Sequence, residues 1–210
     1  METLTTANHN LNGGLSWYRG FIQGKTRKSF AWVFAGVVGF SAREYPILPG
    51  VVLCFLGASL RYWASGYLRK DSRPAVGGPY AYVRNPLYLG TYIMALGIAL
   101  AIQNWILLGI GTVLFAAVYH YIILDEEIKL RKLFKESYVE YCKNVPRFFP
   151  KLWPPFAPAN SKTLKKINPE LSHHRFSQSL AHKNKAYEAY LTFVGLIALV
   201  SAIAYFWKNF

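Results

Sequence analysis

Five apolar stretches separated by short polar breaks constrain the fold of this chain more than any other feature. They cover residues 29–42, 47–67, 87–102, 105–124 and 186–207 of a 210-residue sequence that is 53% hydrophobic. A helix needs roughly 20 apolar residues to cross the hydrocarbon core of a bilayer, so the first stretch spans only with help from its flanks. The pattern predicts an all-α integral membrane protein with about five transmembrane helices.

The segments between these stretches predict the remaining organisation. Residues 125–142 place apolar side chains at helical spacing among lysines and glutamates, which predicts a cytoplasmic amphipathic helix. We expect a cytoplasmic N-terminal segment, a membrane core, a basic linker and an additional C-terminal transmembrane helix. Their expected bounds are residues 1–28, 29–158, 159–185 and 186–210, respectively.

The positive charge of the chain is concentrated on one side of this arrangement. There are 24 Lys and Arg against 10 Asp and Glu, a formal charge of +14. All but Arg43, Arg61 and Lys208 fall in segments on one side, which predicts a multi-pass protein with a cytoplasmic N-terminus. The charge therefore needs no nucleic-acid partner. Because Arg61 lies near the end of the second apolar stretch, we interpret it as a side chain that extends towards the interface, with contact to a ligand as the alternative.

Cysteines and histidines give no indication of a metal site. Cys54 and Cys142 are the two cysteines, too few for a disulfide framework or a cysteine-based metal centre. His173, His174 and His182 fall in the predicted linker without suitably spaced cysteines or carboxylates. We therefore expect no bound metal.

Residues 77–90 (GGPYAYVRNPLYLG) form a polar and aromatic motif directly before the third apolar stretch. Its glycines and first proline predict a turn, and Pro86 delays the next helix to about Leu87, which places Arg84 and Asn85 at the helix entrance. A two-residue turn at 103–104 makes the next helix antiparallel and returns the acidic residues 125–127 to this motif. Three carboxylates at a helix C-terminus oppose the helix dipole, so they require either a ligand or neighbouring cations.

The motif G-x-Y-x-x-x-R-[HN]-P-x-Y-x-G, the acidic run at 125–127 and a later Tyr-x-x-Tyr-x-x-x-Val-Pro together resemble a known family. They are similar to the isoprenylcysteine carboxyl methyltransferase and phospholipid methyltransferase family of membrane enzymes. The resemblance implies an S-adenosylmethionine pocket on the cytoplasmic side and methyl transfer to a lipid-like substrate, either a prenylcysteine carboxylate or a phospholipid amine. The implied cofactor contacts are Tyr80, Asn85, Pro86, Leu87, Tyr88 and Glu126.

Two positions depart from the family pattern. Asn85 replaces the usual histidine, and Ile122 replaces an arginine that some members associate with the substrate. Arg84, Arg147 and His120 are the candidates for the missing cation on the substrate side. Structural roles stay open as well, because tyrosines beside a span commonly form an interfacial belt and a lone histidine is commonly a packed residue.

Two other functions remain open from sequence alone. Sterol reductases, which bind NADPH, share a similar late pattern, to which residues 141–146 (YCKNVP) are close. A non-catalytic membrane protein on the same scaffold is the third hypothesis. The C-terminal helix lies beyond the resemblance, so we expect an accessory anchor or oligomer contact that does not form the cofactor site.

Overall fold

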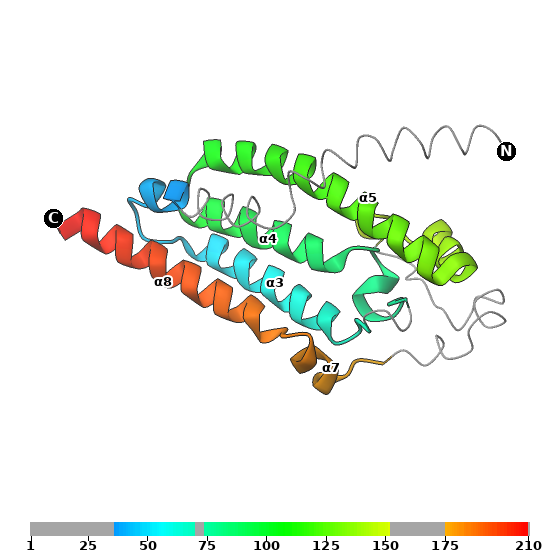
Figure 1. Ribbon diagram of the computed structural model, residues 1–210. Coiled ribbons are helices and arrows are strands. Elements are labelled where there is room, and N and C mark those ends of the chain that lie inside the picture. Colours follow the sequence, from blue (N-terminus) through cyan, green and yellow to red (C-terminus); the bar gives the residue numbers. More distant parts are fainter. Residues whose placement is uncertain (1–35, 70–73, 152–174, 210) are drawn as a thin grey trace.

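The computed structural model describes residues 36–69, 74–151 and 175–209, which contain helices and no strand. The helices are α3 (Leu48–Ser65), η1 (Gly78–Ala81), α4 (Pro86–Ala101), α5 (Trp105–Asn144), α7 (Gln178–Lys183) and α8 (Tyr187–Asn209). The four long helices form an elongated bundle, with η1, α7 and the end of α5 at one end and the C-terminus at the other (Figure 1). The all-helical prediction is therefore confirmed for these residues.

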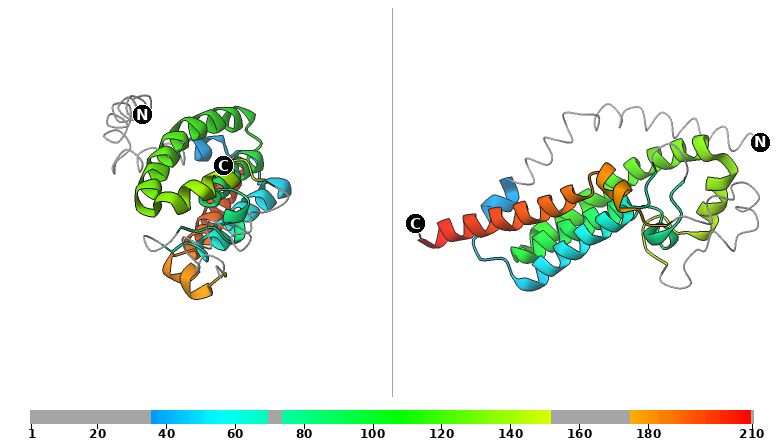
Figure 2. Two further views of the ribbon diagram at one scale, coloured as in Figure 1. Left: turned by 90° about the vertical axis from the view of Figure 1, so that its right-hand side faces the viewer. Right: turned by 90° about the horizontal axis from the view of Figure 1, so that it is seen from below.

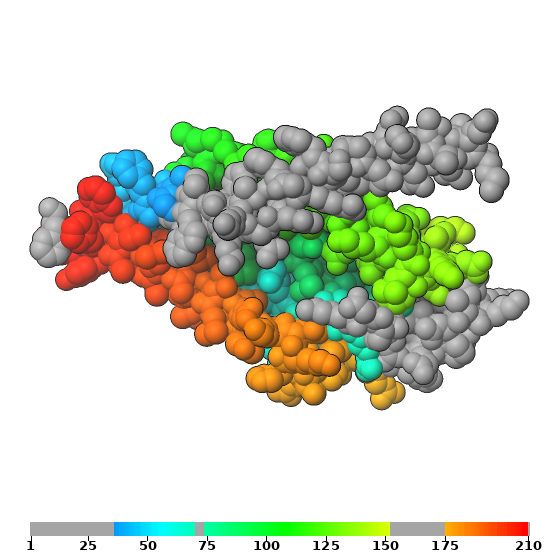
Figure 3. All heavy atoms as spheres, in the orientation of Figure 1, coloured from blue at the N-terminus to red at the C-terminus, as the bar shows by residue number. Residues whose placement is uncertain are grey.

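Three of these helices, α3, α5 and α8, are long and apolar enough to cross a membrane, and α4 is a shorter apolar helix. Their outward side chains are apolar as well: Trp105, Ile106, Val113 and Leu191 are all more than half exposed. Figure 3 shows α5 and α8 contributing to one face of the molecule. Exposed apolar helix faces suit contact with lipid. The predicted count of five spans stays a prediction, because half of the stretch 29–42 lies outside the described ranges.

Small residues bring α3 and α4 into close contact along their length. A Cβ on Gly57 would lie 2.7 Å from the Gly90 carbonyl oxygen, and one on Gly97 would lie 2.5 Å from the Cys54 nitrogen. The Cys54 thiol also donates to the Met94 carbonyl at 3.3 Å. Close backbone approach through glycine is a common way of packing helices in membranes. It fixes the position of α4, whose N-terminus carries the motif.

The C-terminal helix α8 packs against its own chain. The Phe55 ring of α3 lies 5.9 Å from that of Tyr190 and 6.0 Å from that of Phe193. Val200 is fully buried in the core cluster that also holds Cys54 and residues of α4. Figure 2 shows α8 alongside α3 in both views. The helix predicted at 186–207 is thus present, and α3 and α4 bury one of its faces.

The end of the predicted linker is also structured. Residues 178–183 form α7, and the Asn184 side chain donates to the carbonyl oxygens of Ser65 at 2.9 Å and Leu68 at 2.7 Å. Ser65 is the last residue of α3 and Leu68 follows it closely. Asn184 therefore caps the end of that helix from far along the chain. The C-terminal segment is thereby attached to the end of α3 that leads into the motif.

Helix α5 differs from the prediction of a span over 105–124 followed by a separate helix. It continues through the acidic run and breaks at Lys135, whose φ of 45° and ψ of −123° are not helical. Figure 2 shows its last part turning away from the axis of its first part. The acidic residues therefore lie within a helix, and the expectation that they oppose a helix C-terminus is wrong. Leu, Glu, Lys and Arg around them are strong helix formers, which favours continuation.

Candidate functional site

The motif begins with the predicted turn, and a tyrosine ring holds that turn in place. Gly78 has a φ of +58°, a conformation that suits glycine, and a Cβ there would lie 2.4 Å from the Tyr67 ring. The turn continues as η1, in which Tyr80 is only 6% exposed. The predicted turn at 77–79 is confirmed.

The residues after η1 run beside the segment that follows α5. The Arg84 amide donates to the Pro146 carbonyl at 2.9 Å, and the Lys151 amide donates to the Tyr82 carbonyl at 2.9 Å. The Asn85 side-chain amide donates to the Arg147 carbonyl, also at 2.9 Å. Asn85 is buried and joins the entrance of α4 to this later segment. The motif and the segment after α5, whose residues Asn85 and Arg147 are 62 positions apart, are therefore hydrogen-bonded to each other.

A buried ionic network lies beneath this junction. The Glu127 carboxylate is 4% exposed and pairs with the Arg84 guanidinium at 2.9 Å and with that of Arg147 at 2.9 Å. Arg84 Nη1 also contacts Cys142 Sγ at 3.2 Å. The hydrogen bond to Glu127 raises the pKa of Arg147. Arg84 is therefore paired within the protein, and the centre of the network is Glu127, which the sequence suggested as a partner of cations and not as a cofactor contact.

Two tyrosines of α5 complete the closed part of the site. The Tyr141 hydroxyl donates to the Tyr80 carbonyl at 2.7 Å, and Tyr138 and Tyr141 are both nearly fully buried. Burial raises the pKa of Tyr80, Tyr138 and Tyr141 above the ordinary tyrosine value. These hydroxyls therefore remain protonated and support the turn.

The open part of the site is a carboxylate beside aromatic rings. The Tyr88 hydroxyl of α4 donates to Glu126 Oε2 at 2.8 Å, and Glu126 is exposed. The Tyr88 ring lies 5.3 Å from that of Tyr119, which stacks on Phe115 at 3.8 Å. An exposed carboxylate can accept hydrogen bonds from hydroxyl or ammonium groups, and tyrosine faces attract cations. This carboxylate and these aromatic rings fit a ligand such as S-adenosylmethionine, which carries ribose hydroxyls, an amine and a sulfonium.

The other predicted site residues are placed differently. Pro86 is buried, whereas Leu87 presents its backbone carbonyl to the Arg61 guanidinium at 3.3 Å. Arg61 thus bonds across to the first turns of α4, and its interpretation as an interface-directed side chain stays a prediction. His120 is exposed, and its ring lies 5.5 Å from that of its neighbour Tyr121. None of the contacts found in the described parts of the chain connects His120 with the motif.

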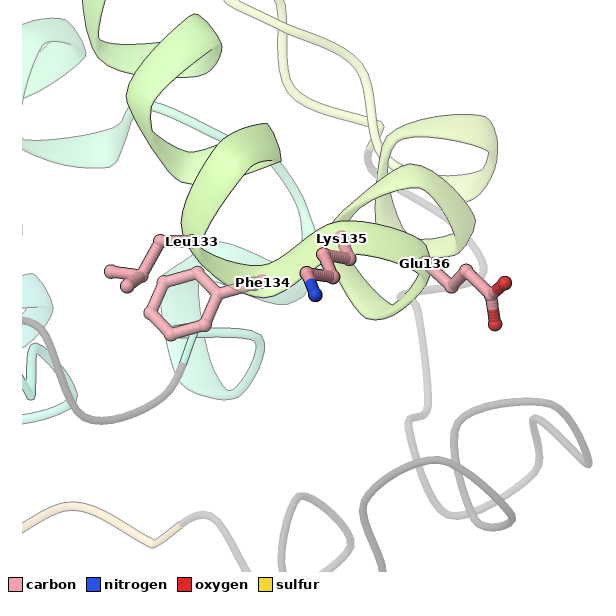
Figure 4. Close-up of a pocket in the computed structure, with 4 residues that line it drawn as sticks. All are labelled: Leu133, Phe134, Lys135 and Glu136. Carbon is pink, nitrogen blue, oxygen red and sulfur yellow. The ribbon is translucent and has the colours of Figure 1, made fainter.

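A pocket of about 300 Å³ lies elsewhere, at the break in α5. Four consecutive residues line it, and Figure 4 shows Leu133 and Glu136 extending in opposite directions. No predicted site residue takes part, so this is an open notch in the helix surface. Within the described ranges, no three His, Cys, Asp or Glu side chains form a group suited to a metal ion.

Comparisons with known proteins agree with the motif. Residues 61–137 match the model of the phospholipid methyltransferase family. A protein-S-isoprenylcysteine O-methyltransferase of Schizosaccharomyces pombe is 35% identical over 98 residues, which cover 45% of this chain and 40% of that protein. The nickel-cobalt-cadmium resistance protein NccN of Alcaligenes xylosoxydans xylosoxydans is 30% identical over 105 residues, 49% of this chain and 47% of that protein. No solved structure matches significantly.

The chain spans less than half the length of these curated relatives. The matched region runs from the last turns of α3 to just beyond the break in α5, so it holds the motif, the acidic run and the open part of the site. The central region of the chain, residues 61–137, is therefore similar to the phospholipid methyltransferase family.

Proposed function

We propose that this protein is a membrane methyltransferase that uses S-adenosylmethionine to methylate a lipid-like acceptor. The observation that carries the proposal is the Tyr88–Glu126 hydrogen bond, which joins the motif on α4 to the acidic run on α5. Both residues lie within the family match, and Glu126 keeps an exposed carboxylate oxygen beside aromatic rings. The finer assignment of cofactor and acceptor rests on this site chemistry and on the family resemblance.

The residues divide into those that contact the cofactor and those that shape its site. In the proposal, Glu126 accepts hydrogen bonds from the cofactor's ribose or amine, and Tyr88 provides an aromatic face and orients that carboxylate. Tyr80, Asn85 and Pro86 are buried and hold the turn against the segment after α5. Leu87 links the turn to α4 and to Arg61.

The reaction needs alignment more than proton transfer. When bound, S-adenosylmethionine supplies an electrophilic methyl group; an acceptor lone pair forms the new bond while the sulfur–methyl electron pair returns to sulfur as a thioether. A carboxylate acceptor needs no general base, whereas a phospholipid ammonium must first lose a proton. Holding the acceptor in line with the methyl group in a site without water is the contribution expected of the protein.

Binding to the purified full-length protein in a neutral detergent tests the proposal. We expect S-adenosylhomocysteine to bind and NADPH not to bind. Glu126→Gln should weaken S-adenosylhomocysteine binding at least tenfold, since a hydrogen bond to a charged group contributes about 1.5–3 kcal/mol. Glu136→Gln, an exposed change on the same helix, is the matched control and should leave the affinity unaltered. Preferential NADPH binding would favour a reductase, and an unaltered affinity in Glu126→Gln would remove Glu126 from the site.

We also propose that the site lies on the cytoplasmic face and that the chain crosses the membrane five times. In support, Lys208 at the end of α8 pairs with Glu44 at 2.7 Å, which places the C-terminal end beside the loop before α3. That end is opposite the site (Figure 1). Single cysteines at Ser179 and Asn209 should be labelled from opposite sides of the membrane. Labelling of both from one side would contradict this topology.

A further inference from the structure

Arg61 is a cation within an apolar helix pair, and its surroundings are unlike those of any other described arginine. It lies one turn before the end of α3, and its Nη1 donates to the Leu87 carbonyl at 3.3 Å and to the Thr91 hydroxyl. A Cβ on Gly90 would lie 2.7 Å from Arg61 Cγ, so the absence of a side chain there makes room for the stem. The guanidinium is therefore directed at the entrance of α4.

No carboxylate pairs with this guanidinium among the residues that the structure describes. Arg84 and Arg147 both pair with Glu127, whereas the ion pairs found include none to Arg61. Glu188 is an acid whose charge influences Arg61, but its carboxylate lies 3.8 Å from Lys185 and is 59% exposed. A cation without a counterion within an apolar helix pair is costly, and such residues commonly mark ligand sites.

The guanidinium also keeps donors for a ligand. It has five N–H groups, and the contacts to Leu87 and Thr91 use Nη1 alone, which leaves Nε and Nη2. Arg61 Nε and Nη2 have no hydrogen-bond partner in the described part of the chain, yet they are not among the fully buried atoms without one. Arg84 Nε is the one such side-chain nitrogen or oxygen in the described residues. The two Arg61 nitrogens are therefore accessible. Nε and Nη2 present parallel donors of the kind that bind carboxylate or phosphate oxygens in pairs.

The position of Arg61 relates it to the proposed cofactor site. Leu87, its partner, directly precedes Tyr88, and Tyr88 holds the Glu126 carboxylate. Of the earlier candidates for a substrate cation, Arg84 and Arg147 pair with Glu127. His120 has no contact with the motif among the described residues and lies against the Tyr121 ring. Among the described cationic side chains, Arg61 is the one that bonds to the motif and has no described acid as its partner.

We propose that Arg61 binds the anionic group of the lipid-like acceptor, a carboxylate or a phosphodiester, at the α3–α4 contact beside Tyr88. This inference rests on the proposed function for its role in catalysis, but the binding itself does not depend on methyl transfer. The apolar chain of the acceptor would lie along the membrane-facing surfaces of the helices, while Arg61 fixes its polar end near the cofactor.

The test compares long-chain acids with uncharged counterparts on the full-length protein in neutral-detergent micelles. A fluorescent fatty acid and its methyl ester separate charge from chain, and a fluorescent dialkyl phosphodiester tests the second anion. We expect wild type to bind at least one anion ten or more times more tightly than the ester, and Arg61→Gln to remove this preference. Preference for the acid indicates a carboxylate acceptor, and preference for the phosphodiester indicates a phospholipid.

Controls separate charge, folding and cofactor binding. Arg131→Gln removes an exposed arginine of α5 and should keep the preference, whereas Arg61→Lys keeps charge without the paired donors and should reduce it only in part. S-Adenosylhomocysteine affinity should stay within threefold of wild type in Arg61→Gln, which also verifies its fold. Wild-type protein that binds anion and ester equally, or a folded Arg61→Gln that keeps the preference, would overturn the proposal. Loss of S-adenosylhomocysteine binding by wild type would instead overturn the proposed function.

Discussion

Two arginines lie in regions that differ in what surrounds the charge: Arg84 is part of the motif, and Arg61 bonds to it from α3. At the junction of the motif with the segment after α5, Arg84 meets Glu127, which also binds Arg147. At the α3–α4 contact, Arg61 meets a carbonyl and a hydroxyl but no carboxylate among the described residues. In the first region both arginines have a carboxylate partner, and in the second the arginine has none among the described residues.

The difference teaches that charge count and proximity to a motif do not identify a ligand-binding cation. A buried acid shared by two arginines is a structural element, because removing one partner leaves the others buried and unpaired. A cation held in place by neutral groups keeps its attraction for an anion. Each prediction below alters one of the two regions and asks whether the other responds.

Glu127→Gln should have the largest effect. The change leaves Arg84 buried without a counterion and Arg147 without its partner, and breaking such a pair typically costs about 3–5 kcal/mol of unfolding free energy. We expect a large fall in the thermal midpoint in detergent, or loss of folded protein. Glu140→Gln, which removes the half-buried partner of the exposed Lys143, should change the midpoint little. A midpoint equal to wild type in Glu127→Gln would show that the network does not stabilise the fold.

Gly90→Ala should act next most strongly, and on the other region. The added methyl group meets the Arg61 stem at 2.7 Å and the Gly57 carbonyl at 2.8 Å, and overpacking of this kind typically costs about 1–3 kcal/mol. We expect a lower thermal midpoint together with a weaker preference for anions over esters. Gly109→Ala has nothing within 4 Å of the new Cβ and should stabilise α5 by up to about 1 kcal/mol. An undisturbed anion preference in Gly90→Ala would separate the glycine from Arg61.

Much of the helical framework was predictable because it follows from local pattern. The runs at 47–67, 87–102 and 105–124 contain α3, α4 and the first part of α5, and Pro86 begins α4 as expected. The return of the acidic run to the motif also followed, since a two-residue turn joins antiparallel helices. Tyr88 and Glu126, which the sequence suggested separately, do meet.

The choice among neighbouring polar residues was not predictable. Adjacent residues on a helix differ by about 100° in direction, so Glu126 is exposed while Glu127 is buried, and the acidic run alone does not give its rotation. The partners of Arg61 were not predictable for a related reason, because they are a backbone carbonyl and a threonine hydroxyl, which carry no charge signal in sequence. The capping of α3 by Asn184 joins residues more than 110 positions apart and has no local signature.

Asn184→Ala should have a smaller effect, confined to the Arg61 region. It removes two hydrogen bonds to carbonyls at the end of α3, each with a net contribution of about 0.5–1.5 kcal/mol. Since Arg61 lies one turn away, we expect a modest fall in midpoint and faster amide hydrogen exchange at residues 61–68. Asn209→Ala, which removes a bond within the last turn of α8, is the control. Faster exchange around Glu127 instead would show that the two regions are coupled.

Tyr141→Phe should have the smallest effect at neutral pH and a distinctive effect in alkali. It leaves the Tyr80 carbonyl without its donor, which costs about 0.5–1.5 kcal/mol. Because burial raises the pKa of Tyr141, the folded protein keeps this proton above pH 10, where the unfolded chain loses it. The unfolded state then binds fewer protons, so the unfolding free energy is fully retained below about pH 10 and falls above it.

Removing this hydroxyl should therefore make the alkaline fall in thermal midpoint shallower, even though the variant is less stable at neutral pH. Midpoints measured between about pH 8 and pH 11 compare wild type, Tyr141→Phe and the exposed control Tyr187→Phe. Buried Tyr80 and Tyr138 still titrate in the variant, so part of the fall should persist. An alkaline fall equal in wild type and Tyr141→Phe would mean that this tyrosine is not protected from ionisation, and that the region around Glu127 is as open as the one around Arg61.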